Sequence, residues 1–253
     1  MSLLRVEGLH KSFGGVHAVQ DISFRLEAGH MLALIGPNGA GKSTCFNLVN
    51  GQLRPDAGKV FINDTDVTGM PPRRIWRQGV GRTFQVPAVF GSMTVLENLQ
   101  VALASHARRS FGLWRPQGER FRDEAMALLE RVGMQSQAER LCGVLAYGDV
   151  KRVELAIALA GAPRVLLMDE PTAGMSRDER HALMNLTRQL TTQGHLGVLF
   201  TEHSLDVVFA HADHIVVMAR GQMVASGKPD AIQANADVQA VYLGKPIAQE
   251  ASV

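Results

Sequence analysis

Short apolar runs recur along this chain, and stretches with helical periodicity separate them. The runs at 31–35, 165–168, 196–201 and 215–219 have the length and composition of buried strands. Residues 3–7 and 22–26 predict two further strands, and the second alternates Ile22, Phe24 and Leu26 with Ser23 and Arg25. Strands that alternate with helices favour an α/β fold with a mainly parallel sheet covered on both faces.

The pattern changes between residues 94 and 160, where helical segments replace strands. Thr94 and Glu97 form a capping box that predicts a helix to about residue 104, and further helices are expected at 121–132 and 149–160. A second capping box at Ser176 and Glu179 predicts a helix that Gly194 closes. We therefore expect one domain, 1–253, with an α/β core at 1–93 and 161–253 and a helical subdomain inserted at 94–160.

Composition and charge narrow the possible functions. Of the 253 residues, 46% are hydrophobic and 20% are charged, which is typical of a globular chain. The formal net charge of +2 lies far below the basic excess of nucleic-acid-binding proteins, so we expect no nucleic-acid partner. Cys45 and Cys142 show no metal-ligand spacing. Because no apolar run approaches the ~20 residues that span a bilayer, we expect any membrane role to depend on a partner.

Residues 36–43 fit the pattern G-x-x-x-x-G-K-[ST], between a predicted strand and a predicted helix that Gly51 can end. In such a loop backbone N–H groups point at a polyphosphate, and the helix start adds free donors. Lys42 supplies a cation for the phosphates and Ser43 a hydroxyl ligand for Mg²⁺. A glycine-rich turn that happens to carry a lysine is the alternative. The residues expected to bind nucleotide here are Gly36, Pro37, Asn38, Gly39, Ala40, Gly41, Lys42, Ser43 and Thr44.

Polar residues follow other predicted strands, and in a parallel sheet such strand ends gather ligand groups. Asp169 ends the run 165–168 and suits a Mg²⁺ ligand, whereas Glu170 next to it suits the polarisation of an attacking water. His203 follows another strand and suits a γ-phosphate or water contact. Alone, adjacent acids or a single histidine are more often solvated turn residues, and the phosphate loop favours the catalytic interpretation. Phe13 is either a core anchor or a stacking platform for a base.

This ordered set resembles the ATP-binding subunit of an ABC transporter over nearly the whole chain. The resemblance identifies Gln85 with the Q-loop glutamine, a catalytic residue and metal ligand, and His203 with the switch histidine. It identifies Phe13 with the aromatic residue that stacks on adenine, and residues 171–176 with the D-loop. It also implies nucleotide contacts, from an opposing chain, by the signature residues Leu145, Ala146, Tyr147 and Gly148.

Finer features resemble one ATPase of branched-chain amino acid importers, namely residues 82–85, 93–99, 145–148, 173–175 and 241–244. The resemblance implies an enzyme that hydrolyses ATP with Mg²⁺ at the cytoplasmic face of the plasma membrane. Its implied partners are a second, different ATP-binding subunit, integral membrane permease subunits and a separate substrate-binding protein. The arginine-rich residues 105–122, which include Arg108 and Arg109, are either a solvated face or the surface that meets the permease.

Several alternatives stay open within this resemblance. Importers of urea, short amides or aromatic acids and an exporter of lipopolysaccharide share the ATP motifs. A soluble ABC ATPase of DNA repair or translation resembles chains with long coiled-coil insertions or tandem halves, and this chain has neither. A P-loop GTPase would carry an Asn-Lys-x-Asp motif, and a P-loop kinase would not explain the signature. Asp149 and Ser176 depart from the family pattern and bear on the hydrolysis rate. A side chain at Gly148 is expected to block backbone approach and to be incompatible with the required φ.

Overall fold

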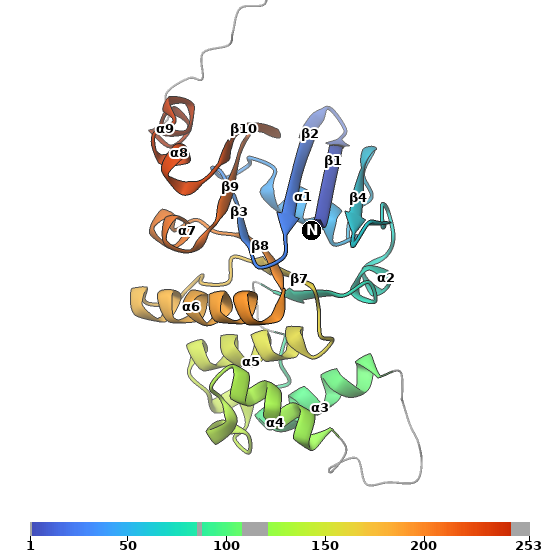
Figure 1. The fold of residues 1–253 in the computed structure, drawn as a ribbon, viewed down its shortest axis with the longest axis vertical. Helices are drawn as coiled ribbons and strands as arrows, with labels where there is room; N and C mark the ends of the chain where they lie inside the picture. The colour runs from blue at the N-terminus through green and yellow to red at the C-terminus, as the bar shows by residue number, and fades with distance from the viewer. Residues whose placement is uncertain (1, 85–87, 108–120, 244–253) are drawn as a thin grey trace, which may run out of the picture.

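The computed structural model describes residues 2–84, 88–107 and 121–243, which contain two β-sheets. The larger sheet has six strands in the order β10-β9-β3-β8-β7-β6 (Figure 1). These strands are β3 (Met31–Ile35), β6 (Val80–Thr83), β7 (Val165–Asp169), β8 (Gly197–Thr201), β9 (His214–Ala219) and β10 (Gln222–Gly227). Five of them run parallel, and β10 pairs antiparallel with β9 at the edge. The predicted, mainly parallel core sheet is confirmed.

The smaller sheet has four antiparallel strands in the order β2-β1-β4-β5. They are β1 (Ser2–Phe13), β2 (Val16–Glu27), β4 (Ala57–Ile62) and β5 (Thr65–Asp66). Strands β1 and β2 are much longer than the predicted segments 3–7 and 22–26. Their outer halves mix polar residues with the buried Leu9 and Val19, and cross-strand pairing extends the hairpin to Phe13 and Val16.

The apolar run of β3 reflects burial on both faces of the large sheet. Leu32 and Leu34 pack with the helix α1 (Lys42–Val49) and the small sheet in one apolar cluster. Ala33 and Ile35 point the other way, into a second cluster that also contains the helices on the opposite side. Because successive strand residues face opposite sides, a strand covered twice has no polar alternation.

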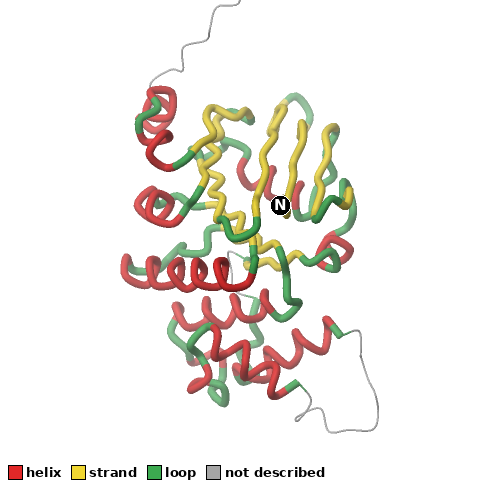
Figure 2. The backbone as a smooth tube through the Cα atoms, in the orientation of Figure 1, coloured by secondary structure: helices red, strands yellow, loops and turns green. Residues whose placement is uncertain are grey.

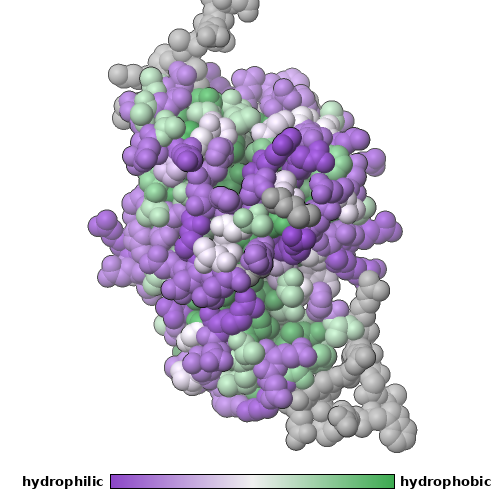
Figure 3. Space-filling model, in the orientation of Figure 1, coloured by the Kyte–Doolittle hydropathy of each residue, from purple (hydrophilic) through white to green (hydrophobic). Residues whose placement is uncertain are grey.

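Helices cover the sheets and form a layer of their own (Figures 1 and 2). Helices α3, α4 and α5 lie together at one end of the molecule, and α6 and α7 lie between them and strands β9 and β10. The remaining bounds are α2 (Pro72–Trp76), α3 (Val95–His106), α4 (Arg122–Arg131), α5 (Tyr147–Leu159), α6 (Arg177–Gly194), α7 (Leu205–His211), α8 (Pro229–Gln233) and α9 (Ala236–Leu243), with 3-10 turns at Gln135–Gln137 and Cys142–Val144. Figure 3 shows apolar side chains on the surface over this helical layer.

Both predicted capping boxes are present, at the starts of α3 and α6. The predicted end of α6 is wrong by one residue. Gly194 is the last helical residue, and His195 takes the left-handed conformation with φ 52° that stops the helix. None of the helices in the described part of the chain is long and apolar enough to cross a membrane.

Candidate functional site

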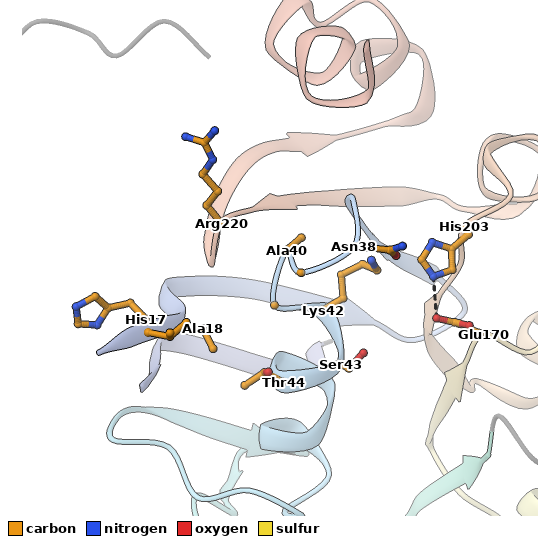
Figure 4. A pocket seen from close by; sticks show the side chains of 13 residues that line it. His17, Ala18, Asn38, Ala40, Lys42, Ser43, Thr44, Glu170, His203 and Arg220 are labelled. Carbon is orange, nitrogen blue, oxygen red and sulfur yellow. Dashed lines mark hydrogen bonds and ion pairs between the residues drawn. The ribbon is translucent and has the colours of Figure 1, made fainter. Parts of the chain in front are cut away.

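A cavity of about 410 Å³ opens at the end of α1 nearest to strands β3, β7 and β8 (Figure 4). Three separate segments meet there. They are the loop from β3 to α1, Glu170 directly after β7, and His203, which follows β8 and Glu202. A fourth contribution comes from the start of β2 and from Arg220. The cavity is lined by Val16, His17, Ala18, Asn38, Gly39, Ala40, Gly41, Lys42, Ser43, Thr44, Glu170, His203 and Arg220.

The two outer glycines of the phosphate loop are required by close packing against neighbouring strands. A Cβ added at Gly36 would lie 2.1 Å from the carbonyl oxygen of Met218 in β9. One added at Gly41 would lie 2.1 Å from the carbonyl oxygen of Ala18 in β2, and Gly41 has φ 97° as the N-cap of α1. The loop is therefore clamped between two strands, and its N–H groups at the start of α1 face the cavity as an anion-binding end of the helix.

Lys42 lies at the centre of this loop. Its ammonium donates hydrogen bonds to the carbonyl oxygens of Gly36, at 2.7 Å, and Pro37, at 3.1 Å. Burial lowers the pKa of Lys42, and the negative charges of Glu170 and Asp169 oppose that shift. The partners of the Lys42 ammonium within this loop are neutral carbonyl oxygens. A bound polyphosphate would supply the negative charge that offsets the cost of burying the ammonium group.

Asp169 ends β7 and is oriented by residues on both sides. The Thr201 hydroxyl of β8 donates to Asp169 Oδ1 at 2.8 Å, and Arg82 of β6 lies 3.8 Å from Oδ2. The parallel register pairs Asp169 directly with Thr201. Arg82 is half-buried; burial lowers its pKa, and Asp169 opposes the shift. Sequence reasoning singled out Asp169 but missed the orienting role of Thr201.

Glu170 and His203 lie side by side in the cavity (Figure 4). The imidazole Nε2–H of His203 donates to Glu170 Oε1 at 2.8 Å. Glu170 has φ 47°, an unusual backbone conformation for a residue with a side chain, and its N–H donates to the carbonyl and hydroxyl oxygens of Thr201. The turn after β7 thus aims one carboxylate, Asp169, back at the sheet and the next, Glu170, into the cavity.

Phe13 lies at the tip of the β1–β2 hairpin and is 48% exposed, so the core-anchor interpretation is wrong. The ammonium of Lys11 lies 5.5 Å from its ring centroid. Phe13 does not line the cavity, although Val16, His17 and Ala18 from the same hairpin do. Its predicted stacking on a base stays a prediction.

The signature residues do not line this cavity either. Helix α5 begins at Tyr147, earlier than expected, with Ala146 as its N-cap, so Tyr147 and Gly148 lie in its first turn. Gly148 has no positive φ, and the expectation that φ requires glycine there is wrong. A Cβ at Gly148 would lie 3.1 Å from Glu179 Oε1 of α6, so the constraint comes from packing within the same chain.

Gln85 and the arginines Arg108 and Arg109 lie outside the described residues. The residue before Gln85 is tightly held. Its N–H donates to Glu154 Oε1 at 2.6 Å, and its carbonyl oxygen accepts from Lys151 Nζ at 2.9 Å. Both of these side chains belong to α5, and sequence reasoning did not single them out.

The oxygen donors available near the loop suit Mg²⁺. Ser43 offers a hydroxyl in the cavity, and Asp169, the residue before the cavity-lining Glu170, offers a carboxylate; both are hard ligands of the kind that this ion prefers. Among the described residues, no cluster of three or more histidine, cysteine, aspartate or glutamate side chains could hold a metal by itself. Such a pair is the partial set with which Mg²⁺ is bound together with substrate phosphates.

A phosphate loop, an acid-bearing strand end and a histidine on one parallel sheet define a P-loop nucleotide-binding protein. The model of the ABC transporter family matches residues 19–173. A model described as the branched-chain amino acid ATP-binding cassette transporter matches residues 222–248. The chain therefore belongs to the ABC transporter family, as an ATP-binding subunit.

Individual relatives and structures agree with this assignment. The chain is 39% identical to the high-affinity branched-chain amino acid transport ATP-binding protein BraF of Pseudomonas aeruginosa, over 96% of this chain and 98% of that protein. It is 38% identical to the corresponding protein LivG of Escherichia coli, with the same shares. Among solved structures it is similar to the ADP conformation of an ATP-binding cassette of an ABC transporter. That likeness has a TM-score of 0.86 and 32% identity and covers 97% of this chain and all of the other.

Proposed function

We propose that this chain hydrolyses ATP with Mg²⁺ and thereby powers the import of branched-chain amino acids or a related small solute. One observation carries the catalytic part: the phosphate loop with Lys42 shares a single cavity with the paired Glu170 and His203. The solute is inferred from the printed functions of BraF and LivG and from the match of the C-terminal residues 222–248.

The residues of the cavity divide the work of phosphoryl transfer. The N–H groups of the loop and the Lys42 ammonium bind the β- and γ-phosphates. Glu170 accepts a proton from the attacking water as general base, and His203 holds the Glu170 carboxylate and faces the γ-phosphate. Ser43 and Asp169 would hold Mg²⁺, with Gln85 as a further predicted ligand, and the ion would supply positive charge that neutralises the phosphates. Phe13 stacks on the adenine.

The division of labour extends to a second chain. The signature residues lie away from the cavity of their own chain, and the first turn of α5 presents N–H groups that a nucleotide phosphate of an opposing ATP-binding subunit can accept. We propose such a composite site, with a different ATPase as the natural partner. We also propose that residues 1–253 act as one ABC domain in which 94–160 form a helical subdomain.

The permease subunits need a surface that the nucleotide does not occupy. A second cavity of about 360 Å³ lies between α2, α3, α5 and β6, and Trp76, Phe84, Ala102 and Ser105 line part of it. It adjoins the segment 105–122 that sequence reasoning singled out. We propose that a cytoplasmic segment of the permease docks there, which places the chain at the cytoplasmic face of the membrane.

Two measurements test this function. Purification of the tagged chain from detergent-solubilised membranes should recover integral membrane subunits together with a second ATP-binding subunit. Uptake of labelled leucine, isoleucine and valine should fall to background when Lys42→Ala replaces the native chain, whereas uptake of urea should not change. Normal amino acid uptake in that strain would contradict the proposed solute, and loss of urea uptake would favour the urea alternative.

A further inference from the structure

Both neighbours of His203 in the sequence are linked by hydrogen bonds to the loop 171–176, Glu202 directly and Ser204 through Arg180. The residue before it, Glu202, is a carboxylate that is only 4% exposed and does not line the nucleotide cavity. Its Oε1 accepts two hydrogen bonds from Thr172, from the N–H at 3.0 Å and from the hydroxyl at 2.6 Å. Its Oε2 accepts the N–H of His203 at 3.2 Å. These three donors compensate the burial of the charge and join the loop to the histidine backbone.

The residue after His203 is tied to the other end of the same loop. Arg180 of α6 donates from Nε to the carbonyl oxygen of Met175 at 2.9 Å and from Nη1 to the Ser204 hydroxyl at 2.8 Å. Ser204 is the N-cap of α7, where a serine normally accepts an N–H of the first helical turn. Here the hydroxyl makes no such capping bond and accepts from Arg180 instead.

We propose that Glu202 and Arg180 are positioning residues of ATP hydrolysis, which fix His203 against the loop 171–176. Neither side chain reaches the cavity, so both act through His203, whose imidazole in turn holds the Glu170 carboxylate. These two hydrogen-bonded ties hold the loop at Thr172, through Glu202, and at Met175, through Arg180. A displacement of this loop would therefore move the histidine. The inference rests on the proposed ATPase activity of this site.

Thr172→Val and Arg180→Gln test the two ties separately, because each removes hydrogen-bond donors and keeps most of the side-chain volume. We expect each change in the full-length chain, paired with its partner ATPase, to lower kcat about tenfold, as misplaced catalytic groups do, with KM for ATP within about twofold. In a His203→Ala background the same changes should lower turnover by less than about twofold, since the group they position is gone. Thr172→Ser should restore kcat to within about twofold of the unmodified chain.

Thr187→Val is the matched control. Thr187 is also a fully buried threonine, but its hydroxyl donates to Leu183 within α6, so kcat should not change. The proposal would be overturned if Thr172→Val and Arg180→Gln lowered kcat equally with His203 present and with His203→Ala. It would also be overturned if neither change lowered kcat. A Thr172→Ser variant as slow as Thr172→Val would overturn it as well. Absence of turnover in the unmodified chain paired with its partner ATPase would instead overturn the proposed ATPase activity, and this inference with it.

Discussion

Replacement of Glu170 by glutamine separates ATP binding from ATP hydrolysis. The backbone of Glu170 is fixed by the bonds of its N–H to Thr201, and these do not depend on the side chain. A glutamine fills the same space, and its amide oxygen can still accept the His203 Nε2–H that now lies 2.8 Å from Oε1. The change removes the ability to take up a proton and the negative charge that acts on the pKa of Lys42. The site should therefore keep its shape and its affinity for ATP.

Turnover should fall by about 10²–10⁴, the scale of losing a positioned general base. At 1.36 kcal/mol per factor of ten this corresponds to roughly 3–5 kcal/mol of transition-state stabilisation. Phosphate release measures kcat, and quenching by a fluorescent ATP analogue measures affinity. Glu130→Gln, an exposed glutamate of α4, makes the same chemical change away from the cavity and should leave both values unchanged.

A Glu170→Gln chain that hydrolyses ATP at the normal rate would return Glu170 to the role of a turn residue. A chain that binds ATP poorly would show that the carboxylate contributes to nucleotide affinity, and the mechanism proposed above would be wrong. The combination of intact affinity and slow turnover is the only result that supports it.

Lys42→Ala should abolish measurable ATP binding, because the loop loses the cation that meets the phosphates, and a retained affinity would refute the site. Ala102→Glu, in the second cavity, should abolish transport while the ATPase activity of the paired ATP-binding subunits persists. Val101→Glu, on an exposed face of the same helix, is its control, and equal transport in both would exclude docking there. Burial and the neighbouring His181 lower the pKa of His211 below its ordinary 6.5, so the unfolded chain binds more protons there and stability is lost as pH falls below about 6.5. His211→Gln should flatten that decline in thermal melts, and an unchanged slope would contradict the assignment.

Local chemistry made much of the fold predictable. A capping box satisfies N–H groups three residues apart, so Thr94 and Ser176 mark the helix starts without any knowledge of the tertiary structure. The apolar run of β3 indicated burial on two faces, because successive strand residues face opposite sides of a sheet. The hairpin beyond residue 7 was not predicted, since its outer half is held by cross-strand pairing and its buried residues, Leu9 and Val19, stand among polar ones.

The site was predictable where function is carried by consecutive residues and not where it depends on packing. The phosphate loop and the acids after β7 stand out in the sequence. Thr201, by contrast, acquires its role from the register of β7 with β8, and Arg180 from the approach of α6 to the start of α7. Glu202 is a charged residue directly after the buried strand β8, and its position in the sequence alone assigns it no role. Its partner Thr172 is distant in sequence, and only the fold brings the two together.

Tyr147→Glu discriminates a structural role of the first turn of α5 from a role in binding the nucleotide of another chain. Tyr147 is 43% exposed, so the change removes little packing, and an acid at the start of a helix stabilises it by about 0.3–1 kcal/mol. The isolated chain should therefore melt at the same or a slightly higher temperature and bind ATP normally. Gly148→Asp is a poorer probe, because its carboxylate would meet Glu179 of the same chain. If α5 closes over a triphosphate, the new charge at Tyr147 should repel it, and ATP-driven pairing of subunits, followed by light scattering, should be lost. A purely structural role predicts that pairing is kept or strengthened, whereas nucleotide binding predicts that pairing is lost. Pairing that survives or strengthens in this variant would therefore show that α5 does not contact the nucleotide.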